Sequence, residues 1–233
     1  MDDRLIEELV LANRILFAQG VVDAYGHVSV RSAADPNRFW LTWAVAPALA
    51  TAADVLSFDL DGNTADAAGR ELYSERFIHA AVYRARPDVM GIVHSHSPAI
   101  IPFTITDVDL RPVWLLSAFL EGSVSLFDTQ DLEGDTDMLV KTPARGAALA
   151  AALGASTVVL LRGHGSVTVG RSVREAVSRA IYTEANAKLQ AEAQRMGTRV
   201  KFLTPGEASL MNDYTKPDVR RQWELWVREL RLK

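Results

Sequence analysis

The sequence predicts an α/β protein in which helices cover a central, mixed and largely antiparallel sheet. Helical and strand patterns are interleaved along the 233 residues, and several short strands follow one another early in the chain without a helix between them. Parallel neighbours need a long crossover between strands, so this order favours a mixed sheet packed between helical layers. The sequence shows no repeat and no linker rich in proline and serine. We therefore expect one domain over residues 1–233, with a helical tail at about 207–233.

The first third of the chain begins with a helix and continues with strands. Apolar residues recur at helical spacing over residues 5–17, and Gly20 follows as a C-cap. Alternating apolar runs then predict strands at residues 28–31, 39–42 and 55–59. Asp61-Gly62 marks a turn of the hairpin type after the last of these strands.

The rest of the chain alternates helix and strand. Ser74 suits the N-cap of a helix that ends near Pro87, and the apolar run 89–94 predicts a buried strand. The elements expected next are, in order, a strand at 139–140, a helix at about 143–153, strands at 158–161 and 167–169, and a long helix at 172–196. Pro205-Gly206 break the chain before a final amphipathic helix.

Composition and charge exclude several classes of function. With 25 Lys+Arg against 29 Asp+Glu, the formal net charge of −4 offers no basic surface for nucleic acid. The chain has no cysteine, which excludes disulfides, thiolate zinc clusters, iron–sulfur centres and a cysteine nucleophile. Any metal must be held by carboxylate, water or the five histidines. The acidic opening Met1-Asp2-Asp3-Arg4 and the shortness of the apolar stretches favour a cytoplasmic protein that does not act at a membrane.

Two histidine motifs are candidates for a metal site. His94 and His96 close an apolar strand, and because strand side chains alternate, both imidazoles face the same side. Gly163-His164-Gly165 follows another apolar strand, and its glycines allow a tight bend. Three imidazoles would complete the ligand set of an open catalytic metal site, although each motif alone could equally be structural.

A candidate for proton transfer stands at the start of a predicted helix. Glu75 follows Tyr73-Ser74 and is either an acid–base group or a helix cap that interacts with the helix dipole. His79 lies one helical turn further on and could share its face, and we interpret it as a supporting residue rather than a ligand.

Taken in order, these motifs resemble the class II aldolase/adducin family. The segments that carry the resemblance are Gly26-His27-Val28-Ser29-Val30-Arg31, Ser74-Glu75, His94-Ser95-His96 and Gly163-His164-Gly165. The likeness extends from about Leu5 to Met196. It implies a three-layer α/β/α fold, usually assembled as a homotetramer with active sites at subunit interfaces.

The resemblance also implies a catalytic constellation. His94, His96 and His164 would bind one divalent metal ion per subunit (Mn, Zn, Fe or Co), and Glu75 would be the catalytic acid and base beside it. A ligand set of three histidines does not distinguish among these metals.

The departures from the sugar-phosphate members of the family bear on the substrate. Those aldolases and epimerases have asparagine where this chain has His27, and a Thr-Pro-Ser-Gly loop where this chain has Thr42-Trp43-Ala44-Val45-Ala46-Pro47. Without the serine hydroxyl and the glycine, the loop lacks what cradles a phosphate. Tyr73 stands in place of one of two serines before the catalytic glutamate. The site therefore favours a flat, partly apolar small molecule, such as an aromatic acid.

One branch of the family fits these features, the metal-dependent decarboxylases of hydroxylated aromatic or pyridine dicarboxylates, such as dihydroxyphthalate or 3-hydroxy-2-methylpyridine-4,5-dicarboxylate. The similarity implies a carboxy-lyase of aromatic catabolism, in which the metal stabilises an enolate- or phenolate-type charge and Glu75 donates a proton. The expected substrate contacts are His27, Ser29, Tyr73, Ser74, Arg162 and Tyr182, with Arg31 as a further candidate. Tyr182 has packing in the long helix as its other interpretation.

Two other functions stay open at this point. A class II aldolase or epimerase would act on a small hydroxycarbonyl compound or a sugar phosphate, and the loss of the phosphate loop argues against the latter. An adducin-like scaffold would keep the fold without catalysis, and the retention of the three histidines and Glu75 argues against it.

Overall fold

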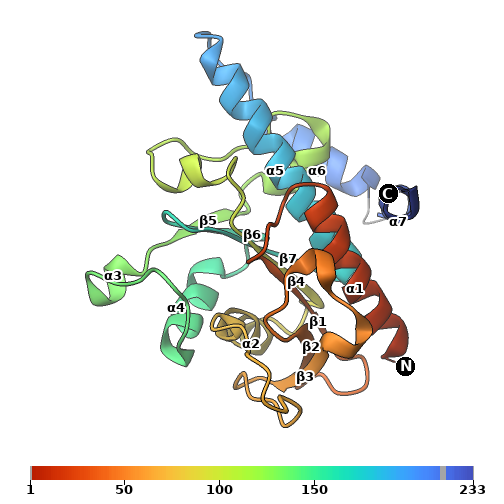
Figure 1. The fold of residues 1–233 in the computed structure, drawn as a ribbon. Helices are drawn as coiled ribbons and strands as arrows, with labels where there is room; N and C mark the ends of the chain where they lie inside the picture. The colour runs from red at the N-terminus through yellow and green to blue at the C-terminus, as the bar shows by residue number, and fades with distance from the viewer. Residues whose placement is uncertain (1, 216–218, 233) are drawn as a thin grey trace.

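A computed structural model describes residues 2–215 and 219–232 of the chain. Seven strands form one sheet in the order β3-β2-β1-β4-β7-β6-β5, with helices on both of its faces (Figure 1). All neighbouring strands pair antiparallel except β5 and β6, which are parallel. The predicted α/β fold with a mixed, largely antiparallel central sheet is confirmed.

The elements have the following bounds. The strands are β1 (His27–Arg31), β2 (Arg38–Thr42), β3 (Val55–Asp59), β4 (Gly91–Ser95), β5 (Val124–Phe127), β6 (Val158–Leu161) and β7 (Gly165–Gly170). The α-helices are α1 (Asp3–Ala18), α2 (Arg76–Ala85), α3 (Gln130–Glu133), α4 (Pro143–Leu153), α5 (Val173–Arg195), α6 (Pro205–Thr215) and α7 (Arg220–Leu232). Short 3₁₀ helices are η1 (Pro47–Leu49), η2 (Ala52–Asp54), η3 (Ile101–Thr104) and η4 (Leu115–Leu120).

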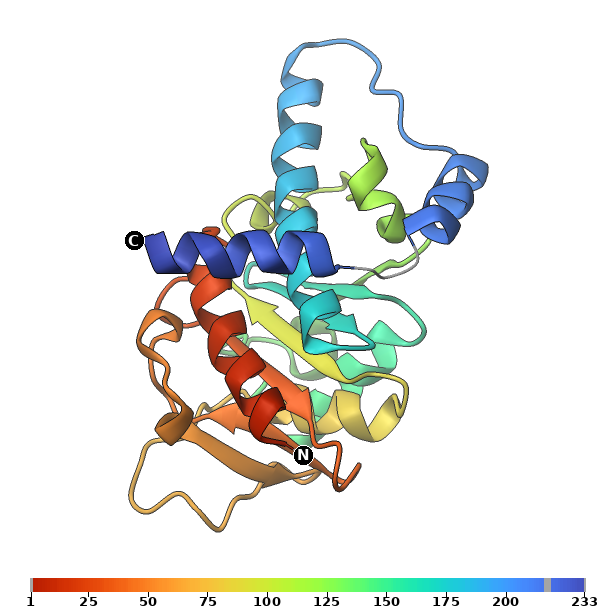
Figure 2. The ribbon, with the colours of Figure 1, turned by 90° about the vertical axis from the view of Figure 1, so that its right-hand side faces the viewer.

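Helices α1, α5 and α7 cover one face of the sheet (Figure 2). Apolar side chains of α1 and α5 pack there against strand residues such as Val28 and Val93. Trp223 and Trp226 of α7 are buried in the same cluster, with 4% and 7% of their surface exposed. The C-terminal helix therefore contributes to the core on this face, because two large aromatic side chains bury apolar surface there.

Helices α2 and α4 cover the opposite face. Ile78 and Tyr83 of α2 pack on Phe39 of β2, and all three side chains are fully or almost fully buried. Gly146 brings α4 against α2, since a Cβ at Gly146 would lie only 2.6 Å from the carbonyl oxygen of Phe77. This close packing fixes the position of α2, the helix that begins beside Glu75.

Several expectations about local structure were wrong. Leu139-Val140 is not a strand, because the Val140 amide donates to the Glu75 carboxylate instead of to a neighbouring strand. Strand β5 was not predicted, because its burial pattern has no regular alternation and Leu126 is exposed. Asp61-Gly62 does form a turn, with Gly62 at φ +79°, but a loop and not a second strand follows it.

Two expected helix boundaries also differ. Ser74 is not the N-cap of α2; that position belongs to Glu75, and no side chain caps the helix. The Glu75 carboxylate points to other partners, which the next section describes. Pro205-Gly206 were expected to break the chain, but α6 begins at Pro205, as helices often do because proline suits the first helical turn.

Across residues 2–215 and 219–232, none of the helices combines the length and apolar character that crossing a membrane requires.

Candidate metal centre

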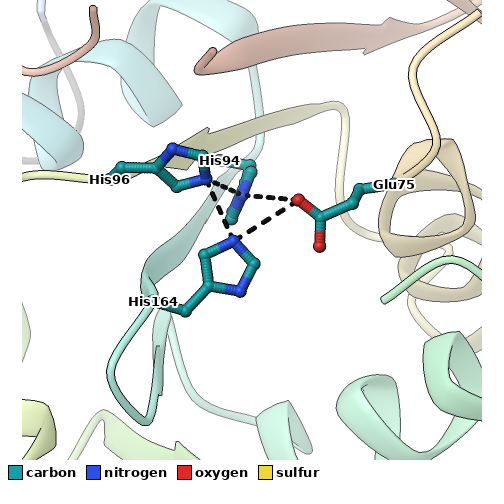
Figure 3. Close-up of side chains that lie close together, drawn as sticks. All are labelled: Glu75, His94, His96 and His164. Atoms are coloured by element: carbon teal, nitrogen blue, oxygen red, sulfur yellow. Dashed lines mark hydrogen bonds and ion pairs between the residues drawn. The ribbon is translucent and has the colours of Figure 1, made fainter. Parts of the chain in front are cut away.

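Four side chains from separate parts of the sequence converge at one point (Figure 3). His94 lies on β4 near its end, His96 follows just after the strand, His164 lies in the turn between β6 and β7, and Glu75 precedes α2. The Nε2 atom of His96 lies 3.1 Å from that of His94 and 3.0 Å from that of His164. Glu75 Oε2 lies 3.4 Å from the Nε2 atoms of His94 and His164. The four candidate ligand atoms all lie within 4.8 Å of one another.

The pairing of β4 with β7 brings the histidines together. The strands are antiparallel, with Ser95 opposite Ser166, so the end of β4 meets the start of β7. Gly165 allows this contact, because a Cβ there would lie 2.0 Å from the Ser95 carbonyl oxygen. Gly163, at φ +62°, turns the chain tightly enough to direct His164 back toward β4.

Backbone carbonyls orient two of the three imidazoles. His94 Nδ1 lies 3.1 Å from the Ser166 carbonyl oxygen, and His164 Nδ1 lies 3.2 Å from that of Met138. A carbonyl oxygen can only accept, so both imidazoles donate a proton from Nδ1 and direct Nε2 toward the shared point. This is the arrangement that metal-binding histidines use. Imidazole nitrogens and a carboxylate oxygen that converge at this distance fit a divalent cation.

The ionisation of the cluster suits the same role. Burial, followed by repulsion from His94 and His164, lowers the pKa of His96 to about 4, so its imidazole is neutral at pH 7 and free to act as a ligand. Burial acts to raise the pKa of Glu75, but interactions with His164 and His94 outweigh it and hold that pKa well below its ordinary range. Glu75 is therefore a carboxylate at neutral pH.

The segment before α4 positions both Glu75 and His164. The Val140 amide donates to Glu75 Oε1 at 2.8 Å, and the Met138 carbonyl accepts from His164. Arg145 of α4 holds this segment, since its Nη1 donates to the Leu139 carbonyl at 2.6 Å. The same guanidinium pairs at 2.7 Å with the carboxylates of Glu133 and Asp137. Met138 has φ +61°, an uncommon conformation for a residue other than glycine, which tertiary contacts of this kind sustain.

His27 lies next to this cluster. It is the residue opposite His94 in the β1–β4 pair, and their ring centroids are 4.9 Å apart. The ring centroid of Tyr73 also lies 4.5 Å from that of His27, and the Tyr73 hydroxyl donates to the Val45 carbonyl at 2.5 Å. Two of the expected substrate contacts are thus beside the histidine cluster.

The structure does not bring the remaining expected contacts to the cluster as free groups. Ser29 is fully buried, and its hydroxyl contacts His79 and Tyr83. Ser74 is exposed at the loop before α2. Arg162 forms an ion pair with Asp128.

Arg31 and Tyr182 are also engaged elsewhere within the chain. The guanidinium of Arg31 donates to backbone carbonyls, among them that of Val89 at 2.9 Å. The Tyr182 ring packs against Trp114 and Trp226, with centroid distances of 5.7 and 6.2 Å.

His79 is connected to the cluster more closely than its interpretation as a supporting residue implied. Its Nε2 lies 2.7 Å from His27 Nδ1, and its Nδ1 lies 2.6 Å from the hydroxyl of Ser29. Ser29 in turn contacts the hydroxyl of Tyr83 at 2.9 Å. The only signal in the sequence was that His79 lies one helical turn after Glu75; the part played by Tyr83 left no signal.

Known proteins resemble this chain over most of its length. Residues 7–191 match the Class II Aldolase and Adducin N-terminal domain. The chain is 36% identical to "Decarboxylase tropJ" of Talaromyces stipitatus, over 93% of this chain and 90% of that protein. It is 28% identical to a 3,4-dihydroxyphthalate decarboxylase of Arthrobacter keyseri, over 89% of this chain and 86% of that protein. Its structure resembles that of an aldolase II superfamily protein from Pseudomonas syringae with a TM-score of 0.82, at 25% identity over 97% of this chain and 92% of the other.

The chain therefore belongs to the class II aldolase/adducin family. The predicted resemblance to the decarboxylase branch is confirmed, because relatives named as decarboxylases match nearly the whole chain. The protein is an enzyme, a carbon–carbon lyase of the carboxy-lyase type.

Proposed function

We propose that the protein is a divalent-metal-dependent decarboxylase of a hydroxylated aromatic or pyridine dicarboxylate. The observation that carries the metal dependence is the convergence of three imidazole Nε2 atoms on the Glu75 carboxylate, with two of the rings held by backbone carbonyls. The substrate class is supported by the name of the Arthrobacter relative, which acts on a dihydroxyphthalate.

His94, His96 and His164 would hold the cation, and Glu75 Oε2 lies at the same point. When bound, a divalent cation supplies a Lewis acid that accepts negative charge as the bond to the departing carboxylate breaks. The protein supplies the orientation: strand β4 and the turn between β6 and β7 fix the rings, and the carbonyls of Ser166 and Met138 fix their tautomers.

Glu75 would carry the proton. As a carboxylate it first takes the proton of a substrate hydroxyl, and it then returns that proton to the ring carbon that has lost CO₂. One carbon–carbon bond is broken, one carbon–hydrogen bond is formed, and the charge is conserved. The Val140 amide, at 2.8 Å from Oε1, keeps the carboxylate directed toward the histidines during both transfers.

The loop at residues 42–47 does not favour the alternative function, an aldolase of phosphorylated sugars. The Ala44 amide donates to the Glu71 carbonyl at 2.9 Å, and the Val45 amide donates to the Trp43 carbonyl at 2.6 Å. The Tyr73 hydroxyl occupies the Val45 carbonyl. Amides that already donate to carbonyl groups of the protein are not available to a phosphate group.

The test is to incubate the protein, loaded with Mn²⁺ or Zn²⁺, with dihydroxyphthalates and hydroxypyridine dicarboxylates and to measure CO₂. We expect release from at least one acid, and loss of that release in His94→Ala and Glu75→Gln. A protein that binds no divalent metal, or that cleaves a hydroxyketone but decarboxylates none of these acids, would contradict the proposal.

The proposal includes a homotetramer with active sites at subunit interfaces. In that assembly a neighbouring subunit supplies the substrate contacts that Ser74, Arg162 and Tyr182 do not make within one chain. Light scattering coupled to gel filtration measures the mass directly, and a monomer with full decarboxylase activity would contradict this part.

A further inference from the structure

Four polar side chains form a continuous hydrogen-bonded chain that runs from the candidate metal centre into the core. His27 Nδ1 lies 2.7 Å from His79 Nε2, and His79 Nδ1 lies 2.6 Å from Ser29 Oγ. Ser29 Oγ lies 2.9 Å from the Tyr83 hydroxyl. All four residues are at most 2% exposed, so water does not satisfy their inner atoms. None of them belongs to the cluster of candidate metal ligands.

Tyr83 fixes the direction of this chain. Among the described residues, Ser29 is the only hydrogen-bond partner of the Tyr83 hydroxyl. The guanidinium of Arg31 lies over the Tyr83 ring at 4.7 Å and has no acceptor to offer. Because a buried hydroxyl proton needs an acceptor, Tyr83 must donate to Ser29.

The positions of the protons on the other three residues then follow in order. The Ser29 proton has His79 Nδ1 as its acceptor, so that nitrogen is unprotonated. His79 therefore carries its proton on Nε2 and donates it to His27 Nδ1. His27 must carry its proton on Nε2.

We propose that Tyr83, Ser29 and His79 are positioning residues that hold His27 as a fixed Nε2–H donor for a substrate carboxylate. This inference rests on the proposed function for the identity of its ligand, but the proton positions follow from the hydrogen bonds alone. The acid that loses one carboxyl group keeps a second one, and a neutral N–H donor binds that group without adding positive charge beside the candidate cation.

The reverse order of donors does not satisfy the same atoms. A proton on His27 Nδ1 would make His79 donate to Ser29 and Ser29 donate to Tyr83. The Tyr83 proton would then be buried without an acceptor, which native structures avoid. A doubly protonated His79 or His27 fails for the same reason, because it also forces Ser29 to donate to Tyr83.

The Nε2 edge of His27 is the part of the ring that a ligand can reach. No described residue forms a hydrogen bond with Nε2, and Nε2 is not among the buried polar atoms cut off from solvent. The ring centroid of His27 lies 4.5 Å from that of Tyr73 and 4.9 Å from that of the metal-ligand candidate His94. A flat acid coordinated at the cluster would therefore meet an aromatic wall and an N–H donor side by side.

The direct test is ¹⁵N NMR of the histidines by magic-angle spinning on zinc-treated protein. The chain has five histidines, so single substitutions suffice to assign each ring. We expect an Nε2 proton and a bare Nδ1 on both His27 and His79. A proton on Nδ1 of either ring, or an imidazolium at neutral pH, overturns the inference.

A binding measurement tests the role of the donor. Phthalate lacks the hydroxyl groups of the proposed substrates and serves as a probe for the carboxylate contact. We expect His79→Leu, which leaves His27 Nδ1 without a donor, to weaken phthalate binding about tenfold, which is the scale of one hydrogen bond to a charged group. His79→Gln, whose amide nitrogen can take the place of Nε2, should restore binding to within about threefold of wild type.

The outcomes separate this inference from the proposed function. Absence of phthalate binding to the wild type, or equal binding by His79→Leu and His79→Gln, overturns the carboxylate contact. If no acid releases CO₂ but the predicted tautomers and the phthalate series are observed, the proposed function fails and the inference stands. If CO₂ is released but His27 carries its proton on Nδ1, the inference alone fails.

Discussion

Replacing Gly165 by alanine should disrupt the metal centre through the backbone, without changing any ligand. A Cβ at Gly165 would lie 2.0 Å from the Ser95 carbonyl oxygen and 3.0 Å from the Cα of His96. Real Cβ atoms essentially never approach closer than 3.0 Å, so the contact with Ser95 must widen by about 1 Å. Gly165 is bonded to His164, and Ser95 is bonded to His96. The widening therefore separates two of the candidate ligands.

The expected loss of affinity follows from coordination geometry. Imidazole–metal bonds are about 2.0–2.1 Å long and tolerate deviations of about 0.2 Å. A separation of about 1 Å exceeds this tolerance several-fold, whereas indirect changes around a metal site typically cost about 10- to 100-fold in affinity. We therefore expect Gly165→Ala to weaken Zn²⁺ binding by at least about 100-fold. The same steric conflict should lower the free energy of unfolding by about 1–3 kcal/mol.

Gly91→Ala is the matched control. It lies in the same β4–β7 pair at the opposite end, opposite Gly170, and its Cβ would meet the Cα of Val173 at 2.6 Å. This variant should lose similar stability but bind Zn²⁺ within about threefold of wild type, because its conflict is remote from the histidines. Competition with a chromophoric chelator measures affinity, and urea unfolding measures stability. Wild-type affinity in Gly165→Ala, or an equal loss in both variants, would refute the reasoning.

Three further predictions address the same centre. Arg145→Met should release the segment that contacts Glu75 and His164, and it should reduce turnover about tenfold or more. The control is Arg84→Met, which removes an exposed ion pair. Burial, followed by repulsion from His94, lowers the pKa of His79 in the folded protein to about 3, from the ordinary 6.5. Between these values the unfolded state binds a proton that the folded state does not. The free energy of unfolding therefore falls as the pH drops from 6.5 toward 3. Urea unfolding at pH 7 and pH 4 should show a smaller difference in His79→Gln than in wild type, and an unchanged difference contradicts the assignment. Zn²⁺ at about 100 times its dissociation constant should stabilise the metal-free protein by about 2.7 kcal/mol, and no shift of the melting temperature with added metal contradicts the site.

The patterns in the sequence predicted strands β1 to β4, β6 and β7, but not β5 at one edge of the sheet. β1 and β4 are buried along their whole length, and the alternation of Val28 and Val30 and the apolar run through Ile92 and Val93 marked them as strands. β5 lies at the edge of the sheet, and its partly exposed residues carry a weaker pattern. Leu139-Val140 has the composition of a strand, but its backbone bonds to a side chain, and residue type does not encode that choice.

In the candidate site, the sequence predicted the ligands better than the groups that orient them. His94, His96 and His164 could be anticipated, because strand alternation and flanking glycines are visible in the sequence. The groups that orient them could not, since they are carbonyls of Ser166 and Met138. Every residue has a carbonyl group, so only the fold determines which of them reaches an imidazole.

Helix α2 connects the two halves of the candidate active site. Glu75 at its start faces His94, while His79, one turn later, contacts His27. His27 and His94 are themselves paired across β1 and β4, so two helix positions and two strand positions close a ring of contacts. α4 presses on α2 at Phe77, between Glu75 and His79, and restricts its movement. On the proposed function, the proton-transferring carboxylate and the carboxylate-binding donor are therefore held at one fixed separation, which would select acids whose two functional groups match that spacing.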